Sequence, residues 1–229
     1  MADSLHAPYG EKSVDFIIER VNKIAELLIA KGVKALVIAC NTATVNAIEQ
    51  LRSQVNIPII GVEPAIKPAA KQSINKKVAI LATQATSKNQ RFNDLIELHR
   101  NGAEVFIQPC PGLVEFIEQG EQHSHICNTL LAQYIEPLVD KGVDTLVLGC
   151  THYPFIQEQI SAIVGQKIKI IETAAPVTLQ LSKKLAELNI MACVTQRGEH
   201  QFFSSQVTNQ QEKIFNKLWQ TSLTLQPLD

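Results

Sequence analysis

The sequence predicts an α/β fold made of two similar halves with mainly parallel sheets flanked by helices. Strand and helix patterns alternate along most of the chain, which is typical of parallel sheets. One stretch also occurs twice. Residues 31–40 and 141–150 lie 110 positions apart, and six of their ten residues are identical. A chain that repeats a strand unit in this way is expected to contain two halves of similar structure.

Each copy of the repeat contains a helix end, a short strand and a cysteine. Gly32 and Gly142 are expected to end the helices, and the apolar strands that follow are expected to be buried on both faces. Cys40 and Cys150 stand at the ends of these strands, where polar residues begin a new helix. Ligands of open α/β sheets bind outside the carboxyl ends of the strands. The repeat therefore predicts two thiols, one from each half, at a shared cleft.

The first part of the chain contains two strands and three helices. Residues 1–13 are expected to be irregular, since Pro8 disfavours helix at the residue before it. Apolar residues at helical spacing predict a helix over 13–30, with Ser13 as its N-cap. The elements expected after Gly32 are a strand at 35–39, a helix to about 53, a strand at 59–62 opened by Pro58, and a short helix at 67–72.

The remaining elements continue the same alternation. Pro111 and Gly112 form a turn that opens a short apolar helix, and Pro137 is expected to bend a longer one. The expected strands are 78–82, 104–108, 168–171 and a last one near 200–203. The expected helices are 89–100, 113–118, 126–141, 156–164, 176–188 and 209–219, followed by a loose tail.

The composition is that of an ordinary globular protein, with 45% hydrophobic and 19% charged residues and a net charge of −1. The basic residues are scattered, which argues against a nucleic-acid-binding protein. The apolar runs are too short to span a bilayer, which argues against a membrane protein. The start lacks a secretory signal, so we expect a cytoplasmic protein whose five cysteines are reduced. The sequence contains neither a C-x-x-C pair nor a glycine-rich phosphate loop, so we expect no metal and no cofactor.

Cys40 and Cys150 acquire a chemical interpretation as a pair. A single cysteine is ordinarily a small buried hydrophobe. A helix N-terminus, however, is expected to lower the pKa of a thiol from its free value of about 8.5. Two thiols that face a ligand from opposite sides suit a stereochemical inversion, in which one removes a proton and the other returns one.

Other polar residues are interpreted by their neighbours. Asn41, Thr42, Thr151 and His152 can hold a polar ligand beside the sulfurs; His152 either orients the Cys150 thiol or is a capping or buried histidine. The remaining candidates are expected to be structural or solvated: Cys110, Cys127 and Cys193 as packing residues, His123 and His125 as solvated surface, and Glu115 as exposed.

Three segments resemble the signatures of bacterial glutamate racemases. They are Pro-Tyr-Gly-Glu-Lys-Ser at 8–13, Ala-Cys-Asn-Thr-Ala-Thr at 39–44 and Leu-Gly-Cys-Thr-His-Tyr-Pro at 148–154. The resemblance covers nearly the whole chain. It implies an enzyme that interconverts L- and D-glutamate for peptidoglycan synthesis, without pyridoxal phosphate or metal, using two cysteines as opposed acid and base.

The resemblance also implies a fold and a site. The fold would be two pseudo-twofold related α/β domains with the active site in the cleft between them, at residues 1–67 plus 177–229 and at 68–176. Cys40 and Cys150 would be the catalytic pair, with His152 beside the second. The substrate-binding positions would be Tyr9, Gly10, Asn41, Thr42, Thr151 and His152, with Thr83, Thr86 and Glu115 lining the cleft.

This chain departs from the family pattern at its start. The family opens with a strand and an Asp-Ser turn, and we expect this unit, on the order of 30 residues, to be missing here. Asp3-Ser4 is not that turn, since no apolar strand precedes it, and Glu172-Thr173 stands where the family tends to have Asp-Ser. The first domain is therefore expected to be the less stable one, or to be covered by a second chain in a homodimer.

Two other functions fit the same residues. One is racemisation of aspartate or another acidic amino acid. The other is a glutamate-binding protein with weak turnover or none.

Overall fold

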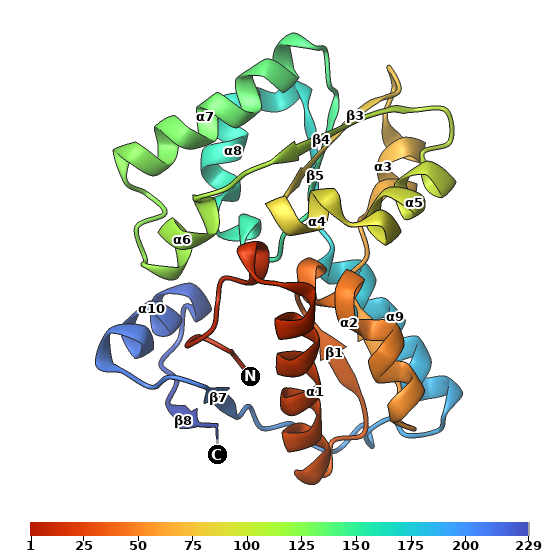
Figure 1. Ribbon diagram of the computed structural model, residues 1–229, viewed down its shortest axis with the longest axis vertical. Coiled ribbons are helices and arrows are strands. Elements are labelled where there is room, and N and C mark those ends of the chain that lie inside the picture. Colours follow the sequence, from red (N-terminus) through yellow and green to blue (C-terminus); the bar gives the residue numbers. More distant parts are fainter. Residues whose placement is uncertain (229) are drawn as a thin grey trace.

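The computed structural model describes residues 1–228 and shows two α/β halves, one above the other in Figure 1. The helices are α1 (Val14–Ala30), α2 (Asn41–Gln54), α3 (Ile66–Gln72), α4 (Gln84–Lys88), α5 (Gln90–His99), α6 (Leu113–Glu118), α7 (His125–Asp140), α8 (Gln157–Val164), α9 (Ala174–Glu187) and α10 (Asn209–Trp219). The strands are β1 (Leu36–Ile38), β2 (Ile59–Gly61), β3 (Lys77–Ala82), β4 (Glu104–Pro109), β5 (Thr145–Leu148), β6 (Lys169–Ile171), β7 (Phe202–Ser204) and β8 (Leu225–Pro227).

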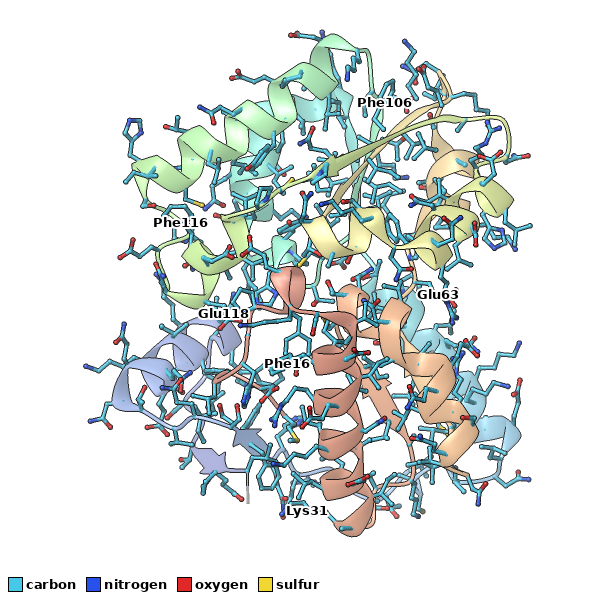
Figure 2. The ribbon with its side chains drawn as sticks, in the orientation of Figure 1. Phe16, Lys31, Glu63, Phe106, Phe116 and Glu118 are labelled. Carbon is cyan, nitrogen blue, oxygen red and sulfur yellow. The ribbon has the colours of Figure 1, made fainter. Side chains whose placement is uncertain are left out.

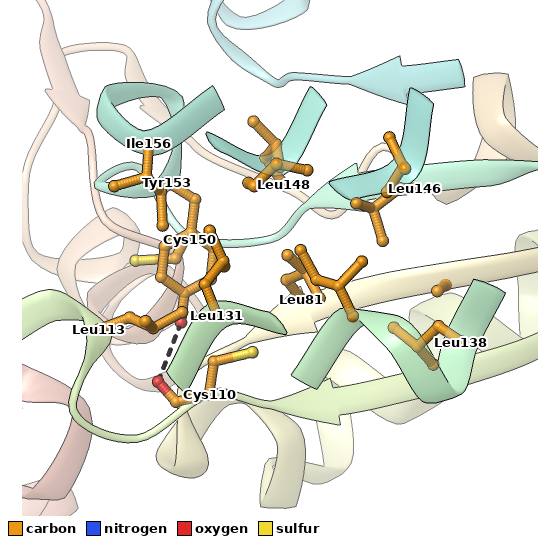
Figure 3. Close-up of a cluster of buried hydrophobic side chains, with 14 of the residues drawn as sticks. Leu81, Cys110, Leu113, Leu131, Leu138, Leu146, Leu148, Cys150, Tyr153 and Ile156 are labelled. Atoms are coloured by element: carbon orange, nitrogen blue, oxygen red, sulfur yellow. Dashed lines mark hydrogen bonds between the residues drawn. The ribbon is translucent and has the colours of Figure 1, made fainter. Parts of the chain in front are cut away.

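The half that contains β3 to β6 is a parallel sheet covered by helices on both faces. Its strand order is β4-β3-β5-β6, and every neighbouring pair is parallel. One face packs against α6, α7 and α8, where Cys150 belongs to the same buried cluster as Leu113, Leu131 and Tyr153 (Figure 3). The other face packs against α3 and α5 through Ile66, Phe92 and Ile96. Burial of apolar side chains on both faces supplies the main stabilisation of this half.

The other half is built on two short sheets. β1 and β2 pair in parallel, and α1 and α2 pack together with them through Ile17, Ile48 and neighbouring apolar residues. β7 and β8 form a second parallel pair, and Ala2 bridges to Ser204 beside them. The chain start and the chain end therefore lie together in this half, as the two termini do in Figure 1.

Local signals in the sequence predicted most elements closely. Ser13 caps α1, since its Oγ accepts a hydrogen bond from the backbone N–H of Phe16 at 3.3 Å. Gly32 and Gly142 both have left-handed backbone conformations, with φ of +80° and +77°, just after the helices that they were expected to end. α6 and α10 have the predicted bounds.

Three expectations about the elements were wrong. β1 is not buried on both faces, because Val37 at its centre is 41% exposed, and the face of the sheet to which it points is left uncovered there. The sequence predicts no element over Gln84–Lys88, but these residues form α4, which Thr83 caps by accepting a hydrogen bond from the backbone N–H of Thr86. The tail is not loose, because β8 finds a parallel partner in β7.

Gly149 lets the second copy of the repeat lie close to its neighbouring strand. Its backbone N–H donates to the Leu81 carbonyl at 2.8 Å. A Cβ at this position would stand only 2.5 Å from that carbonyl oxygen. The first copy has Ala39 at the matching position. The glycine therefore allows the sheet to stay regular up to Cys150.

The bounds of the two domains stay a prediction. Contacts consistent with it are those of α9 with β2, and of the chain start with β7. Between residues 1 and 228, no helix has the length and apolar character that crossing a membrane requires.

We expect β1 to be less protected from hydrogen exchange than its twin β5. β5 lies between β3 and β6 with all four residues buried, whereas β1 pairs with β2 alone. Local opening costs less free energy where fewer contacts break, so amides of residues 36–38 should exchange about tenfold faster or more than those of 145–148. Exchange measured by mass spectrometry checks this, with β3 as the protected control. Equal protection in β1 and β5 would contradict it.

Candidate active site between the two halves

The two cysteine corners meet where the halves touch. Cys40 caps α2, and its Sγ accepts a hydrogen bond from the backbone N–H of Ala43 at 3.4 Å. Cys150 ends the loop after β5 and is buried. The hydroxyl of Thr151 donates to the Ala39 carbonyl at 2.9 Å, so the residues beside the two thiols are in direct contact. The structure thus brings the repeated cysteines together from opposite halves.

The thiol of Cys40 holds its proton more strongly than a free thiol. Its pKa is raised to about 11, mainly by burial and also by the nearby Cys150, although hydrogen bonds from Ala43 and Thr42 lower it by less. The expectation that the helix N-terminus lowers this pKa is therefore wrong for Cys40. Removing the sulfur from water disfavours the thiolate more than one turn of helix stabilises it. Cys40 is a neutral thiol at physiological pH.

Cys150 has a charged neighbour instead. The Nδ1 atom of His152 lies 3.8 Å from the Cys150 Sγ, and its Nε2 atom lies 2.6 Å from the Glu118 carboxylate. Burial lowers the pKa of His152, but the hydrogen bonds to Cys150 and Glu118 raise it by more, to about 10. The imidazolium can donate from both nitrogens, to sulfur on one side and to carboxylate on the other. His152 therefore bridges the Cys150 sulfur and the Glu118 carboxylate.

Glu118 was not among the residues selected from the sequence. It is the last residue of α6 and is labelled in Figure 2. The residue that the resemblance places at the cleft, Glu115, lies one turn earlier in the same helix. Glu118 and His152 are 34 positions apart in the sequence, so no local pattern indicates that they form a hydrogen bond.

Asn41 lies beside Cys40 without a hydrogen-bond partner. Its side chain is 3% exposed, and neither its amide nitrogen nor its amide oxygen has a partner among the described residues. Buried polar groups are nearly always hydrogen-bonded, so an unpaired amide next to the thiol indicates a place for a polar ligand.

Three threonine hydroxyls form a triangle across the two halves. Thr42 on α2 lies 2.9 Å from both Thr83 and Thr86, and the latter two are 3.0 Å apart. Thr86 is completely buried, so it supports Thr83 from behind and does not line the cleft. Thr83 itself remains at the cleft wall.

A small pocket opens beside this triangle. Its walls include Gly10, Thr83, Cys110 and Glu115, and its volume is about 20 Å³. That is room for about one water molecule.

Tyr9 and Gly10 sit at the cleft in different ways. The backbone of Gly10 packs on Thr83, since a Cβ on Gly10 would lie 3.2 Å from the Thr83 Cβ. The hydroxyl of Tyr9, in contrast, donates to the carboxylate of Asp3. The hydroxyl of Tyr9 is therefore directed to Asp3, and the residue that contacts the cleft wall is its neighbour Gly10.

The other cysteines and histidines divide as follows. Cys110 and Cys127 are buried packing residues, and Tyr153 donates to the Cys110 carbonyl at 3.5 Å (Figure 3). Cys193 is exposed, so the expectation that it packs in the core was wrong. His123 and His125 are exposed, as expected. No cluster of three or more His, Cys, Asp or Glu residues suited to a metal occurs within 1–228.

Comparison with known proteins identifies clear relatives. The sequence model of the family described as Asp/Glu/hydantoin racemase matches residues 4–181. A glutamate racemase from Pseudomonas paraeruginosa is 40% identical over 230 residues, covering 100% of this chain and 86% of that protein. One from Ectopseudomonas mendocina is 46% identical over 193 residues, covering 84% and 73%.

Solved structures agree with these matches. A Bacillus anthracis glutamate racemase superposes with a TM-score of 0.87 at 28% identity, covering 99% of this chain and 85% of that one. A Francisella tularensis glutamate racemase in complex with D-glutamate gives 0.85 at 29% identity, covering 99% and 85%. An Escherichia coli glutamate racemase in complex with L-glutamate and an activator gives 0.86 at 29%, covering 99% and 86%.

We expect the Glu118–His152 pair to stabilise the fold in a pH-dependent way. The pKa of His152 is raised from 6.5 to about 10 in the folded chain. Its contribution is therefore fully present below pH 6.5 and is lost as the pH rises toward 10. Glu118→Gln should cost about 1–2 kcal/mol at pH 6 and much less at pH 10.

Thermal unfolding at pH 6, 8 and 10 measures this loss. Glu187→Gln is the control, because Glu187 pairs with Lys184 on an exposed helix face at 2.7 Å and no histidine is involved. The control should stay within about 0.5 kcal/mol of the unmodified chain at pH 6 and 8. A Glu118→Gln penalty that does not fall with pH would contradict the charged state assigned to His152.

Proposed function

The chain belongs to the Asp/Glu/hydantoin racemase family, and we infer that it is an amino-acid racemase that interconverts L- and D-glutamate. The geometry that carries this inference is the contact between two cysteine corners from different halves, made by Thr151 and Ala39. Inversion at a carbon requires one group to take a proton and another to deliver one on the opposite face. Thiols presented from opposite halves of a cleft meet that requirement.

The two thiols are proposed to start in different protonation states. Cys150, beside the His152 imidazolium, acts as the thiolate base that takes the Cα proton of one enantiomer. Cys40, whose pKa is raised by burial, is the thiol that delivers a proton to the other face. After the transfer Cys150 is a thiol and Cys40 a thiolate. After product release, proton exchange with water returns Cys150 to the thiolate and Cys40 to the thiol, so no oxidant or reductant is needed.

His152 and Glu118 are proposed to maintain the base. The imidazolium hydrogen-bonds to the Cys150 sulfur, and Glu118 fixes the orientation of the ring through the 2.6 Å contact to Nε2. A positive group beside a thiol lowers the cost of ionising it. Cys40 has no comparable cation among its hydrogen-bonding partners here, which supports the assignment of opposite starting roles.

We propose that neutral donors hold the substrate. The unpaired amide of Asn41 stands beside Cys40 and can bind a substrate carboxylate or ammonium group. Thr83, Thr151 and the backbone around Gly10 are the further candidates at the cleft wall. Thr42 and Thr86 are proposed to support this wall through the hydroxyl triangle, and Glu115 to face the ammonium side of the pocket.

The setting of the reaction follows from the same chemistry. We propose a cytoplasmic location, because the mechanism needs Cys40 and Cys150 as free thiols. D-glutamate formed there would supply peptidoglycan synthesis. A homodimer is proposed as one way to cover the exposed side of β1, where Val37 is 41% exposed.

We expect replacement of either thiol to abolish racemisation. Cys40→Ala and Cys150→Ala should each lower turnover by about 10²–10⁴-fold, the range of a lost acid or base. Each variant should still exchange the Cα hydrogen of the one enantiomer that faces its remaining thiol. Polarimetry in water and proton NMR in D₂O measure the two outcomes.

The matched control is Cys193→Ala, since Cys193 is exposed and outside the cleft. It should leave turnover unchanged. Racemisation by Cys40→Ala at the normal rate would exclude the two-thiol mechanism. A substrate panel with L-aspartate separates a glutamate racemase from one with another acidic substrate. Glutamate binding without turnover by the unmodified chain would leave only a binding protein.

We also expect turnover without any added cofactor. Dialysis against a strong chelator should not reduce the rate, and the protein should lack absorbance of a pyridoxal group. In the proposed mechanism the side chains of Cys40 and Cys150 carry out both proton transfers, so neither step requires a cofactor. Loss of activity that a divalent metal restores would contradict it.

A further inference from the structure

The N-terminal segment is anchored by the carboxylate of Asp3. This side chain is 7% exposed and accepts two hydrogen bonds from the guanidinium of Arg20, from Nε at 2.9 Å and from Nη2 at 2.8 Å. It also accepts from the hydroxyl of Tyr9, and it lies 2.9 Å from Nδ1 of His6. A buried carboxylate is stable only when its charge is paired and its oxygens are hydrogen-bonded, and Asp3 satisfies both conditions.

The network connects three parts of the molecule. Ala2, next to Asp3, donates to the Phe203 carbonyl at 2.8 Å and so joins β7. Arg20 lies on α1, in the second turn after its start at Val14. Tyr9 opens the short turn of residues 9–11, whose Gly10 packs on Thr83 at the cleft wall. In Figure 1 this segment runs from the chain start near β7 up to the other half before it enters α1.

Asp3 keeps its negative charge, Arg20 its positive charge and Tyr9 its proton over the physiological pH range. Burial raises the pKa of Asp3, but hydrogen bonds from Arg20, Tyr9 and His6 lower it by more, so it stays well below its usual range. Burial and the hydrogen bond to Asp3 raise the pKa of Tyr9. The tyrosine hydroxyl therefore keeps its proton and remains a donor to Asp3.

We propose that Asp3 and Arg20 are positioning residues of the active site, which hold Tyr9 and thereby fix the backbone of Gly10 against Thr83. The inference rests on the proposed racemase function. It changes the role of Tyr9: its hydroxyl acts as a support directed away from the substrate. It also gives a role to Asp3, which lies 37 positions before Cys40 and which the sequence offered no reason to select.

A double-mutant cycle on steady-state racemisation tests this role. Tyr9→Phe removes only the hydroxyl, and Asp3→Asn removes the charge that it binds. If Tyr9 acts through Asp3, each change should raise KM for L-glutamate about 3- to 10-fold with kcat within about twofold, and the double variant should be no worse than Asp3→Asn alone.

Asp3→Asn leaves the Arg20 charge unpaired in a buried site and can prevent folding. The second background is therefore Asp3→Asn combined with Arg20→Gln, which removes both charges together. Tyr9→Phe should again have no further effect on KM there. The control is Asp144→Asn: Asp144 also accepts several hydrogen bonds, from Ser73 at 2.6 Å and Ile74 at 2.7 Å, but precedes β5 at the end away from Cys150. It should lower the melting temperature and leave KM within about twofold.

The outcomes separate the possibilities. Multiplicative effects of Tyr9→Phe and Asp3→Asn would mean that the tyrosine hydroxyl contacts the substrate directly, and would overturn the inference while leaving the racemase function intact. An unchanged KM in both single variants would overturn it as well. Absence of racemisation by the unmodified chain would overturn the proposed function and, with it, the inference.

Discussion

The contact between two strand–helix corners is the interaction on which the site depends. In a parallel sheet every strand ends at the same edge, so a residue after the last strand position is presented outward while the strand itself stays buried. Cys40 follows β1 and Cys150 follows β5, and the hydrogen bond from Thr151 to Ala39 brings these edges together. Neither half alone could place groups on both faces of a ligand. The inversion chemistry therefore requires residues from both halves.

The two corners differ in backbone and in electrostatics: Cys40 is the N-cap of α2, whereas Cys150 lies in a bend that precedes the short 3-10 helix Tyr153–Ile156. Cys40 has only neutral hydrogen-bond donors around its sulfur, and burial keeps its proton on. Cys150 has the His152 imidazolium, whose charge is balanced by Glu118. Inversion requires one thiol to start deprotonated, to take the proton, and the other to start protonated, to deliver one. The repeat thus places one thiol on each side of the cleft, and the side chains around each thiol determine whether it starts protonated or deprotonated.

Much of the fold could be predicted because its signals are local. The hydroxyl of Ser13 caps a helix three residues away, and Gly32 ends one because only glycine adopts its backbone conformation readily. The short helix Leu113–Glu118 follows directly from Pro111 and Gly112. The sequence did not predict β8. Its three residues are a strand only because they pair with β7, which lies more than 20 positions earlier, and three residues are too few to show an alternating pattern.

The sequence by itself determined the α/β class, the repeated unit and the two thiols, because all three are written in short stretches of neighbouring residues. Only the tertiary structure decided which polar groups surround those thiols. Glu118 meets His152, and Asp3 meets Arg20 and Tyr9, through folding of separate segments. It also decided the protonation of Cys40, since the free energy of charging a sulfur depends on how completely the rest of the chain removes it from water.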